Sequence, residues 1–183
     1  MSPTVGVIGG GQLARMMVPA AVNLGIDIRV LAVGEGESAA LAVTELGRHD
    51  SLDDVMRFAQ GVDVVTFDHE HVPQEILTAL VAAGVAVHPG PQALLYAQDK
   101  LLMREKLGAL GLPMPDWARV ETTDELAVFL AGHGGRAVLK TPRGGYDGKG
   151  VRVVRDAAEA ADWFADGSVL LVEELVEFRR ELA

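Results

Sequence analysis

The sequence predicts an α/β fold in which a parallel sheet occupies the first half of the chain and a smaller α/β domain follows. Short apolar strands alternate with amphipathic helices over residues 4–87, which is the pattern of a parallel sheet covered on both faces. Turn-rich breaks follow at 88–91 and 112–115. Glycine accounts for 21 of the 183 residues, more than the usual ~7%, and indicates tight turns and close approaches of the backbone.

Composition is typical of a globular protein and argues against several functions. Hydrophobic residues make up 49% of the chain and charged residues 23%. The lack of cysteine excludes disulfides, thiolate catalysis and Cys-ligated zinc, and the net charge of −10 argues against nonspecific nucleic-acid binding. The longest apolar stretch, 79–87, is shorter than the roughly 20 residues of a membrane span. No secretory signal is visible, so we expect a cytoplasmic protein with no membrane or nucleic-acid partner.

In the first half, hydrophobic spacing predicts each element in turn. Residues 4–8 are a β-branched run closed by three glycines, and apolar positions recur every three or four residues over 12–24, which predicts a helix that Gly25 ends. The remaining predictions are a strand over 26–31, a helix capped at Asp50-Ser51 that runs to Phe58, a strand over 62–67, a helix opened by Pro73 that runs to Ala83, and a strand over 85–87.

The second half begins with a predicted amphipathic helix over 97–110. Strands are predicted at 118–120, 137–140, 151–154 and 168–172, helices at 123–130 and 157–164, and a glycine-rich loop at 142–150. We therefore divide the chain into domains 1–97 and 98–183. The segment 173–183 has no stop signal and the second domain has too few elements for a complete core, so we expect the N-terminal part of a longer protein.

The turn Gly9-Gly10-Gly11-Gln12-Leu13-Ala14 fits the pattern G-x-G-x-x-G/A between a strand and a helix. The free N–H groups and partial positive charge of a helix N-terminus suit an anion. A nicotinamide cofactor would also need an acidic residue at the end of the second strand, and Glu35 lies beyond that point. Three interpretations stay open: a dinucleotide site, a site for another phosphate, and a purely structural turn.

A polar segment, Asp68-His69-Glu70-His71, follows the apolar strand that ends at Phe67. Because open α/β sheets place ligands at the carboxyl ends of their strands, Glu70 is a candidate to bind a substrate amine or sugar hydroxyl. A solvated turn is the main alternative, and a metal site is the least favoured because the His-x-His pair has no third ligand. The isolated histidines are interpreted as structural: His49, His88 and His133.

The stretch from Lys140 to Gly150 carries the strongest functional signal. Lys140 closes an apolar strand, and a loop with four glycines and two further cations, Arg143 and Lys149, precedes the next strand. Loops rich in N–H groups can fold over polyphosphate, with a lysine as a point charge. No Lys-Ser/Thr opens a helix, so this is not a Walker A loop. A mobile hairpin tip with solvated charges is the alternative.

Residues 170–176 predict a strand that runs into an extended connector. The N–H and C=O groups of extended backbone can read the edge of adenine, and Glu181, a few residues on, could accept hydrogen bonds from ribose hydroxyls. Taken alone, the same residues also fit an ordinary acidic surface.

Together these segments resemble the ATP-grasp superfamily, because Lys100, Lys140, the loop 144–150, the segment 173–176 and Glu181 occur in its order. Within it, the sequence is similar to the 5-(carboxyamino)imidazole ribonucleotide synthases, at residues 9–16, 70–72, 99–100 and 144–150. The resemblance covers essentially the whole chain. It implies a Rossmann-like pre-ATP-grasp domain with a parallel sheet, followed by the first, lid part of an ATP-grasp domain.

The resemblance implies a ligase that carboxylates 5-aminoimidazole ribonucleotide with ATP and bicarbonate, through carboxyphosphate, in purine biosynthesis. Carried over by position, the catalytic residues would be Lys140, Asp147 and Lys149. ATP would be bound by Lys100, Lys140, Gly145, Tyr146, Asp147, Gly148, Lys149, Gly150, Glu173, Glu174, Leu175, Val176 and Glu181. The ribonucleotide would contact Gln12, Leu13, Glu70 and Tyr146.

The same resemblance implies a homodimer and Mg²⁺, whose ligands are expected in the half of the family's length that lies beyond this chain. Residues 1–183 alone are therefore expected to be inactive. The alternatives are a formate-dependent glycinamide ribonucleotide ligase of the same superfamily, a nucleotide-binding regulatory fragment, and a nicotinamide-dependent oxidoreductase. The last would leave the loop 140–150 unexplained.

Overall fold

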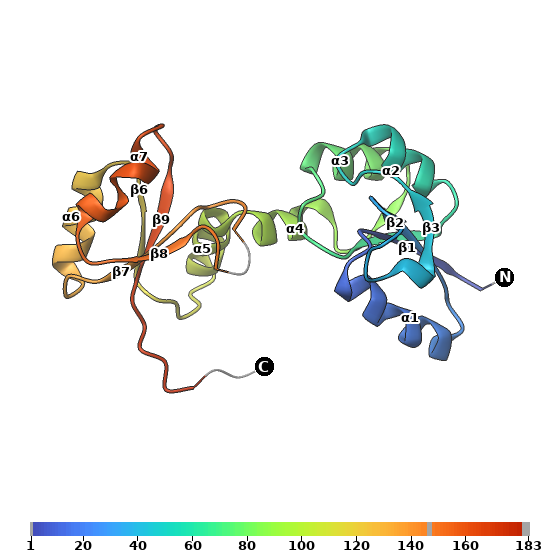
Figure 1. Cartoon of the computed structure of the whole chain (residues 1–183), viewed down its shortest axis with the longest axis horizontal. Helices are drawn as coiled ribbons and strands as arrows, with labels where there is room; N and C mark the ends of the chain where they lie inside the picture. The colour runs from blue at the N-terminus through green and yellow to red at the C-terminus, as the bar shows by residue number, and fades with distance from the viewer. Residues whose placement is uncertain (1, 146–147, 181–183) are drawn as a thin grey trace. The chain divides into compact units, whose positions relative to one another are not determined.

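The computed structural model describes residues 2–145 and 148–180. The chain divides between Leu95 and Tyr96 into two compact units, unit 1 (Met1–Leu95) and unit 2 (Tyr96–Ala183), each with its own sheet (Figure 1). Three residues with predicted roles, Tyr146, Asp147 and Glu181, lie outside the described residues.

Unit 1 is built on a parallel sheet with the strand order β3-β2-β1-β4-β5. In the register of the central strands, Val7 of β1 lies opposite Val30 of β2 and Thr66 of β4. The order reverses between β1 and β4, and at such a switch point the carboxyl ends of the strands border a crevice that binds ligands in many α/β proteins. The strands are β1 (Thr4–Ile8), β2 (Asp27–Ala32), β3 (Val43–Leu46), β4 (Val64–Phe67) and β5 (Ala86–Val87).

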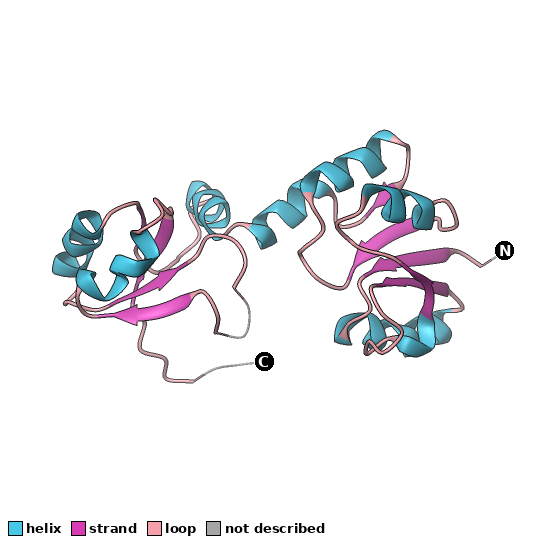
Figure 2. Cartoon of the chain, turned by 45° about the horizontal axis from the view of Figure 1, so that its top comes forward, coloured by secondary structure: helices cyan, strands magenta, loops and turns pink. Residues whose placement is uncertain are grey.

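Helices cover both faces of this sheet (Figure 2). On one face, α2 (Leu52–Ala59) and α3 (Gln74–Ala82) bury Phe58, Leu77 and Leu80 against β1, β2 and β4. On the other face, α1 (Gln12–Leu24) and a 3₁₀ turn, η1 (Ala40–Ala42), pack against a smaller core around Val7 and Val30. The parallel sheet that the alternating pattern predicts is therefore present.

Local signals place the predicted boundaries in unit 1 to within two residues. Helix α1 has the predicted bounds and ends at Gly25, whose φ of 66° is a left-handed conformation suited to glycine. The Ser51 side chain caps α2 by accepting the Asp54 N–H. Pro73 occupies the cap position of α3 and not its first turn. The sequence analysis missed β3, an edge strand whose residues alternate between half-buried and exposed and include Thr44 and Glu45.

Unit 2 has an antiparallel sheet with the order β6-β9-β7-β8. Its core lies on one face, where the sheet residues Leu139, Leu170 and Val172 pack with Leu126 of α6 (Thr123–Gly132). The elements are α5 (Lys100–Ala109), β6 (Trp117–Val120), α6 (Thr123–Gly132), β7 (Ala137–Lys140), β8 (Val151–Val154), a 3₁₀ turn η2 (Ala157–Ala160), α7 (Ala161–Phe164) and β9 (Leu170–Glu174).

The opposite face of this sheet carries a different set of side chains. Because side chains alternate along a strand, the registers of β7 with β8 and β9 place Lys140, Val151, Leu171 and Glu173 on this face. Val151 and its neighbour two residues on, Val153, are more than 40% exposed. We call this the open face after its exposed β8 edge; over β9, its residues Leu171 and Glu173 are buried.

Two helix predictions are wrong. Residues 97–110 do not form one helix, because Asp99 adopts an extended conformation (φ −131°) between α4 (Pro91–Gln98) and α5. Its carboxylate accepts the N–H groups of Leu101 and Leu102, so it caps a new helix. Residues 157–164 form η2 and a single turn, α7, in place of one α-helix, and the side chain of Asp156 caps η2.

Within the described residues, no helix combines the length and apolar character that crossing a membrane requires.

Candidate functional site

The glycine turn of unit 1 lies at the carboxyl end of β1, beside the end of β4. Here the Asp68 carboxylate accepts hydrogen bonds from the N–H groups of Gly11 and Ala14, the latter at 2.8 Å. Glu37 accepts the N–H of Gly10 at 3.1 Å, and it also accepts those of two residues after β2, Val33 and Gly34. The chain's own carboxylates therefore occupy these donors, where the sequence analysis left a phosphate as one interpretation.

The glycines of this turn are needed for the approach of those carboxylates. A Cβ at Gly10 would lie 2.6 Å from Glu37 Oε2, and a Cβ at Gly11 would overlap the Asp68 carboxylate. The geometry thus favours the structural interpretation of the turn. A dinucleotide pyrophosphate would have to displace two carboxylates, which argues against a nicotinamide cofactor at this position.

The predicted substrate residues of unit 1 surround this turn. Gln12 and Leu13 form the exposed start of α1, with Leu13 56% exposed. Glu70 is half-buried and follows Asp68 after β4. The structure thus brings Glu70 and the first turn of α1 to the same edge of the sheet, around the carboxylate of Asp68.

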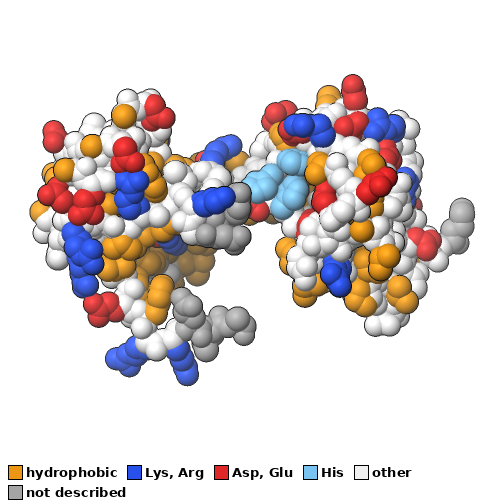
Figure 3. All heavy atoms as spheres, viewed as in Figure 1, with side chains coloured by type: hydrophobic (Ala, Val, Ile, Leu, Met, Phe, Trp, Pro, Cys, Tyr) orange, Lys and Arg blue, Asp and Glu red, His pale blue; other side chains and the backbone are white. Residues whose placement is uncertain are grey.

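Three histidines stand close together at this edge (Figure 3). The ring of His69 is 4.7 Å from that of His49 and 5.2 Å from that of His71, measured between centroids. Burial lowers the pKa of His49 and of His69, and the neighbouring imidazoles lower the pKa of His69 further. Within residues 2–145 and 148–180, no three His, Cys, Asp or Glu side chains are placed to hold a metal ion.

On the open face of unit 2, Lys140 belongs to a cluster of three charged side chains. Glu173, only 3% exposed, is bonded through Oε2 to Lys140 Nζ and through Oε1 to the guanidinium of Arg104. The sequence analysis did not identify Arg104. Its spacing of four residues from Lys100 on a charged helix is the signal that could have found it.

The glycine loop between β7 and β8 is held at both of its stems. The backbone N–H of Lys100 donates to Pro142 O and its ammonium donates to Gly144 O, both at 2.9 Å. Arg143 Nε donates to Asp99 Oδ2 at 2.8 Å, and Thr141 N–H donates to Gly150 O at 2.9 Å. The N-terminus of α5 therefore anchors one stem, and Thr141 joins it to the other.

The predicted adenine segment, 173–176, is the end of β9 and the extended chain after it. Strand alternation separates its first two side chains, since Glu173 lies on the open face and Glu174 on the other. Glu174 Oε1 accepts the Asp116 N–H at 3.2 Å. The Glu174 N–H in turn donates to Asp116 O at 2.8 Å, so both the side chain and the N–H of Glu174 are bonded to Asp116. Leu175 is half-buried and Val176 is 41% exposed.

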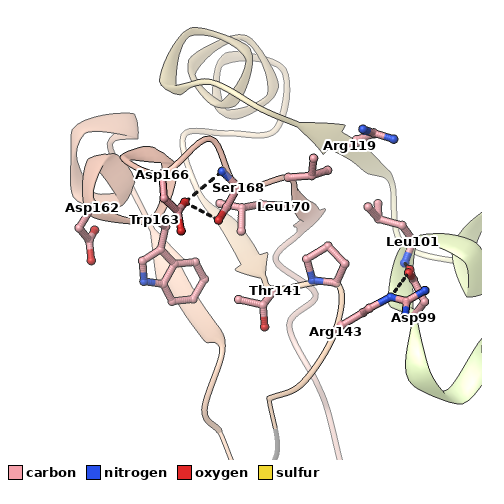
Figure 4. Close-up of a pocket in the computed structure, with 12 residues that line it drawn as sticks. Asp99, Leu101, Arg119, Thr141, Arg143, Asp162, Trp163, Asp166, Ser168 and Leu170 are labelled. Atoms are coloured by element: carbon pink, nitrogen blue, oxygen red, sulfur yellow. Dashed lines mark hydrogen bonds and ion pairs between the residues drawn. The ribbon is translucent and has the colours of Figure 1, made fainter. Parts of the chain in front are cut away.

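A pocket of about 610 Å³ lies elsewhere in unit 2, between the Asp99–Arg143 ion pair and Trp163 (Figure 4). Leu170 and Thr141 line it from the sheet. None of the predicted nucleotide-binding residues that the structure describes lines this pocket. It is therefore distinct from the Lys140 cluster.

Comparison with known protein families identifies both parts of the chain. Residues 1–98 match the family described as the ribonucleotide synthetase preATP-grasp domain, and residues 105–183 match the ATP-grasp domain. This chain belongs to the ribonucleotide synthetase preATP-grasp family. The first match covers the parallel sheet with its glycine turn, and the second covers the antiparallel sheet with the glycine loop.

Curated relatives carry the name N5-carboxyaminoimidazole ribonucleotide synthase. The protein of that name from Mycobacterium bovis is 49% identical over the whole of this chain and 44% of its own length. The one from Pseudomonas aeruginosa is 38% identical over 98% of this chain and 50% of its own length. The chain spans about half the length of the curated relatives it matches.

Solved structures show the same fold. The synthase of that name from Aspergillus clavatus, complexed with ATP, matches with a TM-score of 0.83 and 32% identity over 97% of this chain and 48% of that one. A structure of the A. clavatus protein with ADP and 5-aminoimidazole ribonucleotide has the same TM-score and 28% identity, over the same shares of the two chains. The chain is thus similar in fold to carboxyaminoimidazole ribonucleotide synthases whose structures contain ATP or ADP.

Proposed function

We propose that this chain is the N-terminal portion of a ligase that carboxylates 5-aminoimidazole ribonucleotide with ATP and bicarbonate. The observation that carries the proposal is the anchored glycine loop of unit 2, with Lys140 at its base and the Lys100 ammonium on Gly144 O. A loop of N–H groups with flanking cations suits a polyphosphate. The names of the relatives, and solved structures of relatives with ATP or ADP bound, suggest the substrate class.

In this reaction the residues of unit 2 would position and neutralise the triphosphate. Phosphoryl transfer to bicarbonate needs positioning and charge stabilisation more than a general base. Lys100 and Lys140 would hold phosphate oxygens, and Gly145, Gly148, Lys149 and Gly150 would close over them. The backbone of 173–176 would face adenine. The roles proposed for Tyr146, Asp147 and Glu181 rest on the resemblance of their sequence positions alone.

In unit 1, the ribonucleotide would meet Gln12, Leu13 and Glu70 at the carboxyl edge of the sheet. The amine of the aminoimidazole is a hydrogen-bond donor, and a carboxylate such as that of Glu70 accepts. We do not assign its phosphate to the N–H groups of Gly10, Gly11 or Ala14, since Glu37 and Asp68 occupy these donors. Carboxyphosphate would form from ATP and bicarbonate, and the amine would then attack its carboxyl carbon and release phosphate.

We further propose domains 1–97 and 98–183, Mg²⁺ as the partner of ATP, a homodimer and a cytoplasmic location. Bound Mg²⁺ would neutralise phosphate charge, and no residue of this chain is assigned as its ligand. The division of the chain between Leu95 and Tyr96 supports the domain proposal. Light scattering during gel filtration of the native-length protein tests the dimer: a monomer mass would contradict it.

The deciding experiment measures ADP release by the native-length protein with 5-aminoimidazole ribonucleotide, with and without bicarbonate. Glycinamide ribonucleotide with formate is the matched control pair. ADP release that needs both the aminoimidazole and bicarbonate is the expected result. Activity with the formate pair alone would keep the fold and overturn the substrate. No ADP release with either pair would contradict a ligase, and residues 1–183 alone are expected to release none.

A further inference from the structure

We propose that Arg104 and Glu173 are positioning residues that hold the Lys140 ammonium where it meets the phosphates of the nucleotide. The inference rests on the proposed function, because it takes Lys140 as a phosphate ligand. It adds a role for Arg104, which sequence reasoning did not identify, and it gives the Glu173 side chain a role of its own, as a partner of Lys140, beside the adenine contact proposed for the backbone of 173–176.

Strand register places Glu173 between its two cations. β9 pairs with β7 so that Glu173 lies opposite Val138 and Leu171 lies opposite Lys140, which puts the Glu173 and Lys140 side chains on the open face. Oε2 of Glu173 is bonded to Lys140 Nζ. Oε1 is approached by both Nε and Nη2 of Arg104 from α5. Each carboxylate oxygen therefore has a cation of its own.

Helix α5 carries two cations, Lys100 and Arg104, about one helical turn apart. Lys100 and Arg104 are four residues apart and so lie on the same side of the helix. Lys100 is bonded to the glycine loop at Gly144 O and Arg104 to β9 at Glu173. One helix therefore fixes both the loop that would cover the nucleotide and, through Glu173, the lysine that would meet its phosphates.

The three side chains of the cluster differ in how far they are exposed to solvent. The side chain of Glu173 is 4% exposed, that of Arg104 16% and that of Lys140 25%, so Lys140 is the most accessible of the three. A carboxylate sheltered from water needs charged partners, and a lysine stem is flexible unless its ammonium is held. A held ammonium loses less conformational freedom when a ligand binds.

Charge balance explains why the arginine is required in addition to the carboxylate. Two cations around one carboxylate leave a net positive charge, which attracts an incoming phosphate. With Arg104 removed, the Glu173 carboxylate would neutralise Lys140 alone and compete with phosphate for its ammonium. Since both nearby nitrogens of Arg104 already face Glu173, we assign Arg104 a role through Lys140 and not a direct phosphate contact.

The test compares ADP with adenosine, which lacks phosphates, in calorimetric titrations of the native-length protein. The variants are Arg104→Met, Arg104→Lys, Lys140→Met and the double variant Arg104→Met with Lys140→Met. We expect Arg104→Met to weaken ADP binding by about tenfold, as for loss of a charge-assisted contact, and to leave adenosine binding unchanged. Arg104→Lys should restore part of the loss. In the Lys140→Met background, Arg104→Met should have no further effect.

Arg152→Met is the matched control. Arg152 forms an ion pair with Asp162 in the same unit and lies over the ring of Trp163, so its loss tests the effect of a missing ion pair away from Lys140. We expect this variant to bind ADP like the native protein. Thermal unfolding checks that each variant is folded. If Arg104→Met does not fold, Arg104→Lys, which keeps the charge, replaces it in the comparison.

Three results would overturn the inference while leaving the proposed function intact: unchanged ADP affinity in Arg104→Met, equal losses for ADP and adenosine, or losses that add to those of Lys140→Met. Equal losses would indicate a merely structural role, and additive losses would indicate a direct phosphate contact. A native protein that binds no ADP would instead overturn the proposed function, and this inference with it.

Discussion

Asp68 joins two segments that are far apart in the chain. It is 8% exposed, follows β4, and accepts the N–H groups of Gly11 and Ala14 at the start of α1. A negative charge at a helix N-terminus is stabilising, and it satisfies donors that a helix cannot pair internally. These bonds tie the glycine turn to the end of β4, two residues before Glu70.

Replacing Asp68 with Asn should lower the free energy of unfolding of unit 1. The amide places an N–H₂ group opposite a backbone N–H, so one buried donor loses its acceptor, at a cost of about 1 to 3 kcal/mol. Urea unfolding followed by circular dichroism measures the change. Asp63→Asn is the control, since Asp63 accepts the Thr4 N–H in an exposed position. Equal losses in both variants would contradict the special role of Asp68.

The histidine cluster predicts how stability depends on pH. Burial lowers the pKa of His49 and His69 below the ordinary value of 6.5, so the fold favours their neutral forms. Their stabilising contribution is present above pH 6.5 and is lost as the pH falls through their lowered pKa values. The unfolding midpoint of unit 1 should therefore decrease on acidification.

Thermal unfolding between about pH 5 and about pH 8 checks this dependence. His69→Gln should flatten the pH dependence, because it removes one of the two groups that must be neutral in the fold. The exposed His88 lies in the same unit, and His88→Gln should leave the slope unchanged. If the unfolding midpoint changes with pH by the same amount in His69→Gln and in the native protein, this explanation is contradicted.

At the level of elements, two glycines in the loop between β7 and β8 have both a left-handed backbone and close neighbours that leave no room for a side chain. Gly145 and Gly150 have positive φ and also lie against Thr141. A Cβ on Gly145 would come within 2.6 Å of Lys149 O. Gly148 also has a positive φ, but a Cβ there would meet no atom within 4 Å. The loop thus offers a matched pair of positions.

Gly145→Ala should destabilise unit 2 more than Gly148→Ala. Both variants place a side chain in a left-handed conformation, at about 1 to 2 kcal/mol, and only Gly145→Ala adds a clash, worth about 1 to 3 kcal/mol. Chemical unfolding followed by tryptophan fluorescence reports on unit 2, since Trp117 and Trp163 both belong to it. A loss in Gly148→Ala as large as that in Gly145→Ala would show that the backbone conformation alone matters.

Element boundaries were predictable where they have a local cause. The run 12–24 and Gly25 predict α1 correctly because helix periodicity and a left-handed glycine are properties of neighbouring residues. The helix predicted over 97–110 is wrong because its apolar spacing continues across Asp99, where the carboxylate instead caps α5 and bonds to Arg143. An edge strand such as β3 buries little side-chain surface, so its pattern is weak.

The two units have separate hydrophobic cores. Phe58 and Leu77 lie in a cluster made of residues of unit 1, and Leu126 and Leu139 lie in one made of residues of unit 2. Each core is a sheet covered by helices from the same unit, so each has its own source of stability.

Leu139→Ala should therefore shift the unfolding of unit 2 alone. Truncation of this fully buried side chain costs about 2 to 5 kcal/mol, and the midpoint seen by tryptophan fluorescence should decrease by more than the one seen by circular dichroism. Leu77→Ala, the matched substitution in unit 1, should change circular dichroism and leave fluorescence unmoved. A common shift of both signals in both variants would instead indicate one cooperative core.

Lys100 is identified as a candidate only through the resemblance to the ATP-grasp superfamily, and β3 and α4 were not predicted. The alternation of strands and helices in most of the chain, and Lys140 with the glycine loop as candidates, could be inferred from the residues alone, because hydrophobic period and glycine conformation are local properties. The partners of these groups could not. Arg104 reaches Glu173 across 69 positions, and Asp68 reaches Gly11 across 57. Such pairings depend on strand order and register, which bring distant backbone segments together and are specified by the packing of the whole unit.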